Sequence, residues 1–121
     1  MGQRSYHLSN VIFAVPYKDF DYYADIVNQR GDRVTEAIKE MIASQDVSEW
    51  YTLFALLCEY QSVLYHFENV LESITLGGEV DLENNRWLID KDVASKLSVY
   101  VASEAICRRE LSQYNLSFSS H

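Results

Sequence analysis

The sequence contains little of the residue types that shape turn-rich or cross-linked folds. It has one proline, four glycines and two cysteines in 121 residues. So few turn formers argue against an all-β fold, which needs many tight turns. Two cysteines do not make the dense disulfide framework of a small secreted domain. Because 48% of the residues are hydrophobic, the chain can bury one core, and we predict a single domain over residues 1–121.

Long hydrophobic segments are also missing. The first ten residues, MGQRSYHLSN, lack the apolar stretch of a secretory leader. The longest uninterrupted apolar run near the middle of the chain extends from Leu53 to Cys58, far short of the ~20 residues that span a bilayer. These two absences predict a cytoplasmic protein with reduced thiols and no membrane partner.

Lysine and arginine are absent from residues 40–85, although the chain has ten of them elsewhere. The same interval holds nine acids, which are Glu40, Asp46, Glu49, Glu59, Glu68, Glu72, Glu79, Asp81 and Glu83. The net charge of −8 therefore comes from this block. Such a block repels phosphate backbones and anionic lipids, and it is compatible with a partner that has a basic surface. The acids can equally serve only to keep a hydrophobic helix soluble, and the sequence leaves both interpretations open.

A long helix is predicted over residues 47–76. Asp46 and Glu49 resemble a capping box, and Gly77 with Gly78 supplies the end. Between them, apolar residues alternate at spacings of three and four without a break, at Trp50, Leu53, Leu57, Tyr60, Leu64, Phe67, Leu71 and Ile74. This spacing is a heptad seam, which packs against other helices. Small residues on the other side, and an apolar N-terminal half, suggest a helix buried on several sides.

Shorter elements are predicted before the long helix. Residues 10–15, NVIFAV, favour a short strand that stops at Pro16. A first helix then carries an apolar face at Phe20, Tyr23, Ala24 and Val27. Gly31 suits a C-terminal cap, and Asp32 can begin a second helix with its own stripe at Val34, Ala37, Ile38, Met41 and Ile42.

A β-hairpin is predicted over residues 79–89, with its turn at Asn84 and Asn85. Asp90 or Asp92 can cap a final helix, whose stripe is Val93, Leu97, Tyr100, Cys107, Leu111 and Tyr114. Residues 1–9 and 115–121 are expected to be flexible tails. The predicted fold is thus mainly α, a four-helix bundle-like domain around the long helix, with a small hairpin and a short N-terminal strand.

Motifs that specify a reaction are not found. The glycines form no phosphate-binding loop. His66 is the only histidine in a predicted helix, and Glu59, on the same face, lies two turns or ~10 Å away along the axis. Cys58 is also too far from His66 along the helix to act with it as a nucleophile–base pair. We therefore assign no catalytic residue, no cofactor and no metal ligand.

The favoured function is a small acidic binding module, non-enzymatic, that regulates, inhibits or chaperones a partner protein with a basic surface. Nine tyrosines support this, because tyrosine is enriched at interfaces. The candidate partner-binding residues are Glu68, Glu72, Tyr65, Glu79, Asp81 and Glu83. One alternative is a nucleic-acid-mimicking inhibitor that occupies a basic groove, although the acids of the long helix point in different directions. Another is an enzyme or ligand-binding domain with a pocket near His66.

Self-association is also predicted. A helix of roughly 29 residues is ~43 Å long. A compact globule of this chain length has a diameter of ~35 Å, so such a helix crosses the whole domain. Either the helix is bent, or its end overhangs the domain and packs on something outside the monomer. Two packable faces on that helix then favour a homodimer.

Overall fold

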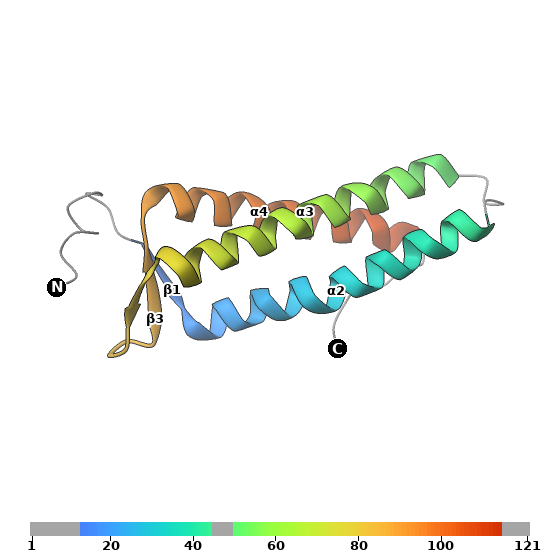
Figure 1. The fold of residues 1–121 in the computed structure, drawn as a ribbon. Helices are drawn as coiled ribbons and strands as arrows, with labels where there is room; N and C mark the ends of the chain where they lie inside the picture. Colours follow the sequence, from blue (N-terminus) through green and yellow to red (C-terminus); the bar gives the residue numbers. More distant parts are fainter. Residues whose placement is uncertain (1–12, 45–49, 115–121) are drawn as a thin grey trace.

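The computed structural model describes residues 13–44 and 50–114. These ranges contain three helices, a three-stranded antiparallel sheet and a short 3-10 helix (Figure 1). In chain order the elements are β1 (Phe13–Pro16), α2 (Tyr17–Ser44), α3 (Trp50–Gly77), β2 (Glu79–Asp81), β3 (Arg86–Ile89), α4 (Lys91–Leu111) and η1 (Ser112–Tyr114). The predicted mainly helical fold is confirmed. The predicted flexible tails and the proposed cap at Asp46 and Glu49 lie outside the described residues.

The four-helix bundle is wrong in its number of helices, because the two helices predicted before residue 45 are one. Helix α2 runs through Gly31 without a break, and Gly31 does not adopt a positive φ. The stripes on either side of Gly31 are in phase, so a straight helix buries both against α3. Val27 and Val34 are both in the core. A break at Gly31 would have turned one of these stripes away from it.

The seam of α3 is confirmed. Its residues from Leu53 to Ile74 are all buried, and Trp50 is half-buried. The helix begins at Trp50 and ends at Gly77, where Gly78 donates its backbone N–H to the carbonyl of Ile74 at 2.8 Å. The opposite face is exposed at Ala55 and Cys58, so the expected burial on several sides is not found among the residues that the structure describes. No helix in the two described ranges combines the length and apolarity needed to cross a membrane.

The predicted hairpin and N-terminal strand join in one sheet with the strand order β1-β3-β2. Phe13 pairs with Ile89, and Val80 pairs with Trp87. Asn85 at the turn has a φ of 52°, the left-handed conformation that asparagine tolerates well. Its carbonyl accepts a 2.9 Å hydrogen bond from the backbone N–H of Tyr17, which attaches the hairpin turn to the start of α2.

Helix α4 begins at Lys91, and of the two predicted caps, Asp90 and Asp92, it is Asp90 whose side chain accepts a 3.0 Å hydrogen bond from the N–H of Val93. Its buried residues are Leu97, Glu104, Cys107 and Leu111. The predicted stripe therefore packs inward, but it omitted Glu104.

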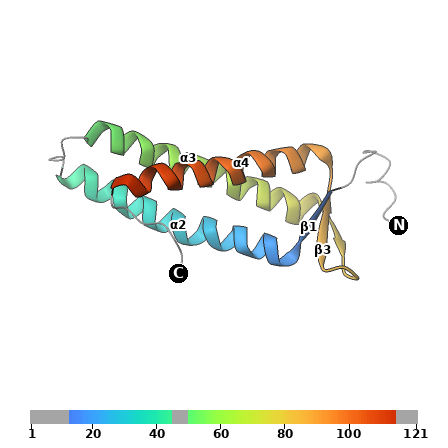
Figure 2. The same cartoon turned by 180° about the vertical axis from the view of Figure 1, so that it is seen from behind.

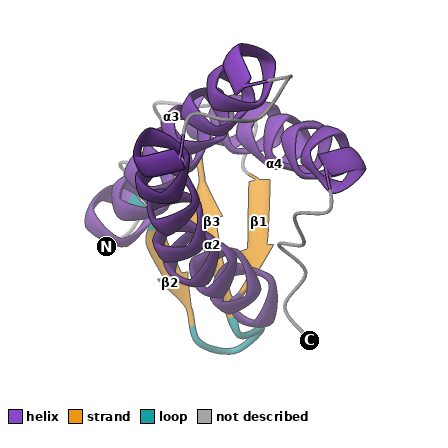
Figure 3. Ribbon diagram, turned by 90° about the vertical axis from the view of Figure 1, so that its right-hand side faces the viewer, coloured by secondary structure: helices purple, strands orange, loops and turns teal. Residues whose placement is uncertain are grey.

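The three helices form an elongated bundle in which α3 packs against both α2 and α4 (Figures 1 and 2). Figure 3 looks along the helices and shows the sheet across their far end. Because α2 and α3 each have 28 residues and run side by side, α3 does not overhang a globule as predicted. Its seam is buried within one chain, so that argument for a homodimer is lost, and homodimerisation stays a prediction.

Candidate functional site

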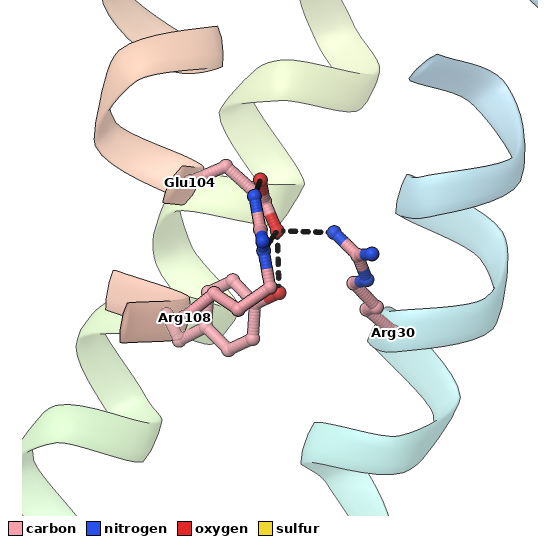
Figure 4. Close-up of polar contacts among 4 residues, drawn as sticks. Arg30, Glu104 and Arg108 are labelled. Carbon is pink, nitrogen blue, oxygen red and sulfur yellow. Dashed lines mark hydrogen bonds and ion pairs between the residues drawn. The ribbon is translucent and has the colours of Figure 1, made fainter. Parts of the chain in front are cut away.

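A polar layer crosses the middle of the apolar bundle. It consists of Arg30 on α2, Tyr60 on α3, and Glu104 and Arg108 on α4 (Figure 4). Nη1 of Arg30 donates to Oε2 of Glu104 at 2.7 Å, and the Tyr60 hydroxyl donates to the same oxygen at 2.7 Å. Arg108 adds two hydrogen bonds to the carboxylate, at 3.2 and 3.3 Å. The layer therefore links all three helices through one carboxylate.

Burial and hydrogen bonding act in opposite directions on Glu104. Burial raises the pKa of its carboxyl, but hydrogen bonds from Arg108, Tyr60 and Arg30 outweigh burial and hold that pKa below its ordinary value. Burial first, and then the Glu104 carboxylate, raise the pKa of the Tyr60 hydroxyl well above its ordinary value. The carboxylate thus stays ionised and the phenol stays protonated. A carboxylate held this way is a poor general acid or base at neutral pH.

All three helices contribute a residue of their seam to this layer. Helix α2 shows the same alternating spacing as α3, at Phe20, Tyr23, Val27, Arg30, Val34, Ala37 and Met41. Helix α4 shows it at Val93, Leu97, Tyr100, Glu104, Cys107 and Leu111. Sequence reasoning missed Arg30 and Glu104 because charged residues were read as gaps in the stripes. The unbroken spacing through both positions was the signal that could have found them.

The hydrogen bonds of this layer can align the packed helices. A polar residue at a seam position fixes the register of packed helices, because any shift leaves it unpaired in an apolar core. Within residues 13–44 and 50–114, no group of three His, Cys, Asp or Glu side chains is arranged to hold a metal ion.

A surface groove lies between α2 and α3. It joins one hollow of about 310 Å³ to another of about 280 Å³, and the two share Val27, Asn28 and Glu68. Helix α2 lines it with Phe20, Ala24, Val27, Asn28, Gly31, Asp32 and Thr35. Helix α3 lines it with Gln61, Leu64, Tyr65, Glu68, Leu71, Glu72 and Thr75. These residues form the acidic groove.

The acidic groove contains three carboxylates and no lysine or arginine in its lining. Asp32 lies on the α2 wall, and Glu68 and Glu72 lie one turn apart on the α3 wall. All three are exposed, and no ion pair or side-chain hydrogen bond within the described residues engages them. The groove therefore presents negative charge above an apolar floor.

Three of the six predicted partner-binding residues, Glu68, Glu72 and Tyr65, line this groove together. Tyr65 is 61% exposed, which leaves its ring available at the rim. Sequence reasoning missed Asp32 as a groove residue, because it was interpreted as a helix cap. Once α2 is known to be continuous, Asp32 faces the same hollow as Tyr65.

The three hairpin acids are separate from the groove lining. Glu79 is half-buried on β2, and Glu83 is exposed at the turn as predicted. Asp81 accepts hydrogen bonds from Asn84 at 3.0 Å and Arg86 at 2.8 Å, which lower the pKa of its carboxyl. Because Asp81 is already paired within the hairpin, its charge is partly neutralised by Arg86.

A third hollow, of about 450 Å³, is lined by β1 and α4 together with Tyr23 of α2 and Ile89 of β3, and it is mainly apolar. His66 lines none of these three hollows. It is exposed on α3, and its ring stacks on Tyr100 with centroids 5.6 Å apart. The predicted pocket near His66 therefore gains no support from them.

Comparison of the chain with family models, with curated proteins and with solved structures found no match.

Proposed function

We propose that this chain is a non-enzymatic binding module that recognises a basic segment of a partner protein in the acidic groove. The observation that carries the proposal is the groove itself. It combines an apolar floor at Val27, Leu64 and Leu71 with three carboxylates that have no partner among the described residues. An apolar floor supplies affinity, and unpaired charge at the rim supplies steering and specificity.

Electrostatics support a protein partner over a nucleic acid. The carboxylates of Asp32, Glu68 and Glu72 repel phosphates, and the groove lining holds no base to offset them. Long-range attraction between these acids and a basic partner raises the association rate, and salt screens that attraction beyond ~10 Å at 0.1 M. The association rate should therefore fall steeply as the salt concentration rises.

The test is affinity capture from a native lysate, followed by binding kinetics on the captured protein. The double variant Glu68→Gln with Glu72→Gln should slow association about tenfold at low salt and leave dissociation nearly unchanged. The matched control is Glu59→Gln with Glu110→Gln, because both acids are exposed and lie near Cys107, on the side of the bundle where α3 meets α4. Equal association rates for the two double variants would overturn the proposal.

A further inference from the structure

We infer that the acidic groove receives an amphipathic helix of the partner, seated against Gly31, with lysine or arginine at positions one turn apart. This inference rests on the proposed function and adds the conformation and spacing of the bound segment. Four features of the groove carry it, namely its length, its helical walls, the unexplained glycine in its wall and the spacing of its acids.

The walls of the groove are two helices that run side by side. The α2 wall extends over residues 20–35 and the α3 wall over residues 61–75, so the groove is ~21 Å long. A helix of ~14 residues has that length. No residue of β1, β2 or β3 lines the groove, so no strand edge is available there. An extended segment would leave its backbone N–H and C=O groups without partners, whereas a helix satisfies its own.

Gly31 is the third feature. It lies inside α2 without a positive φ, and a Cβ atom built there meets no atom within 4 Å. The fold of this chain therefore does not require glycine at this position, and glycine inside a helix is less stable than alanine. Gly31 also lines the hollow that contains Asp32 and Tyr65. The absence of a side chain at Gly31, which the fold of this chain does not require, lets another helix approach α2 closely.

The acids set the chemistry of the occupant. Glu68 and Glu72 are four residues apart and exposed on the same wall. Two basic residues at positions i and i+4 of a helix have the same spacing and can pair with both. Asp32 lies on the opposite wall and can meet a third base from the other side. The occupant thus has an apolar stripe of small residues facing Gly31 and Val27, bordered by lysine or arginine.

The test uses synthetic peptides as probes. A stapled helix of 14 residues carries alanine and leucine on one face and lysine at i and i+4. One comparison peptide replaces lysine by glutamate, and the other has a central proline in place of the staple. Amide shifts of the isotope-labelled protein map the site, and fluorescence anisotropy measures affinity. The lysine helix should bind saturably, shift amides around Gly31 and Glu68, and bind about tenfold more tightly than either comparison peptide.

Two protein variants complete the test. Gly31→Leu fills the groove and should weaken binding of the lysine helix about tenfold or more, without lowering the denaturation midpoint, because leucine is a better helix former than glycine. Ala55→Leu makes the same kind of change at an exposed position of α3 outside the groove lining, and it should leave affinity unchanged. Wild-type affinity in Gly31→Leu, or shifts confined to another face, would overturn the inference.

The remaining outcomes separate this inference from the proposed function. If the proline peptide bound as tightly as the lysine helix, the groove would recognise an extended segment and not a helix. If the glutamate peptide bound as tightly, the requirement for lysine or arginine in the occupant would be wrong. A lysine helix that does not bind at millimolar concentration would also overturn the helical occupant. In each case, the proposed function would still hold if the captured partner associated more slowly with the double variant Glu68→Gln and Glu72→Gln than with the wild type.

Discussion

Replacing Glu104 by leucine should destabilise the protein by about 3–5 kcal/mol, because it leaves the buried Arg30 guanidinium without its ion-pair partner. The Arg30 side chain is only 4% exposed, so water cannot replace the lost carboxylate. The Nε atom of Arg30 is already buried with no hydrogen-bond partner among the described residues, so the guanidinium depends on its hydrogen bond to Glu104. Since the free energy of unfolding of a small domain is about 5–15 kcal/mol, this loss is a large part of the total stability. Urea denaturation followed by circular dichroism measures it.

Two comparison variants make this prediction specific. Asp92→Asn removes an exposed ion pair with Lys96 on the same helix, and it should change stability by less than about 1 kcal/mol. The triple variant Arg30→Met, Tyr60→Phe and Glu104→Leu removes every buried polar group of the layer, and it should recover most of the loss. An unchanged midpoint for Glu104→Leu would refute the reasoning. A triple variant no more stable than Glu104→Leu alone would refute it as well.

The pH dependence follows from the same carboxyl. Burial opposes its ionisation, but hydrogen bonds from Arg108, Tyr60 and Arg30 lower the pKa of Glu104 below the ordinary 4.5 in the folded protein. A lowered folded pKa means that the stabilisation is complete above the unfolded pKa and is lost as pH falls through the folded pKa. The stability difference between the wild type and Glu104→Gln should therefore narrow below about pH 4.5. A difference that stays constant down to pH 3 would contradict this account.

Gly31→Ala should raise the free energy of unfolding by about 0.5–1 kcal/mol, whereas Gly78→Ala should lower it, because its Cβ would lie 2.7 Å from a backbone oxygen of α3. Leu57→Ala should cost ~2–5 kcal/mol, since Leu57 is fully buried in the seam, and an unchanged urea midpoint would show that the seam is not the core. A thiol reagent at pH 8 should label the exposed Cys58 quickly. Cys107 should react only after unfolding, because it is buried and burial raises the pKa of its thiol to about 11.

The elements that the sequence predicted well are those whose local signals and packing agree. Three examples are the seam of α3, the Asn84–Asn85 turn and the Asp90 cap. In each, a local residue preference agrees with the hydrophobic pattern of the segment or of its neighbours. The predicted helix end at Gly31 was wrong because glycine is only a weak helix breaker. Burial of the in-phase stripes on both sides of Gly31 overrode its local preference. The burial of Glu104 was not predicted because its hydrogen-bond partners Arg30 and Tyr60 are far away in the sequence. No local window of the sequence contains the groups that compensate for burying its charge.

The acids of the candidate site were only partly predictable. Composition located a block of negative charge, and Glu68, Glu72 and Tyr65 proved to line a common groove. Nothing local distinguished them from Asp81, whose charge is paired with Arg86 inside the hairpin. Which acids remain unpaired depends on the turn geometry and on the docking of α2 against α3. Both are properties of the assembled fold.

The pairing of β1 with β3 has a consequence for the order of folding. Phe13 pairs with Ile89, so the pairing of β1 with β3 cannot be completed until synthesis has passed residue 89. Helices α2 and α3 are complete before that point, and the β2–β3 hairpin needs only local closure. Closing the long loop to β1 costs more entropy than closing the hairpin. Strand β1 should thus attach late, completing the end of a bundle that is already in place.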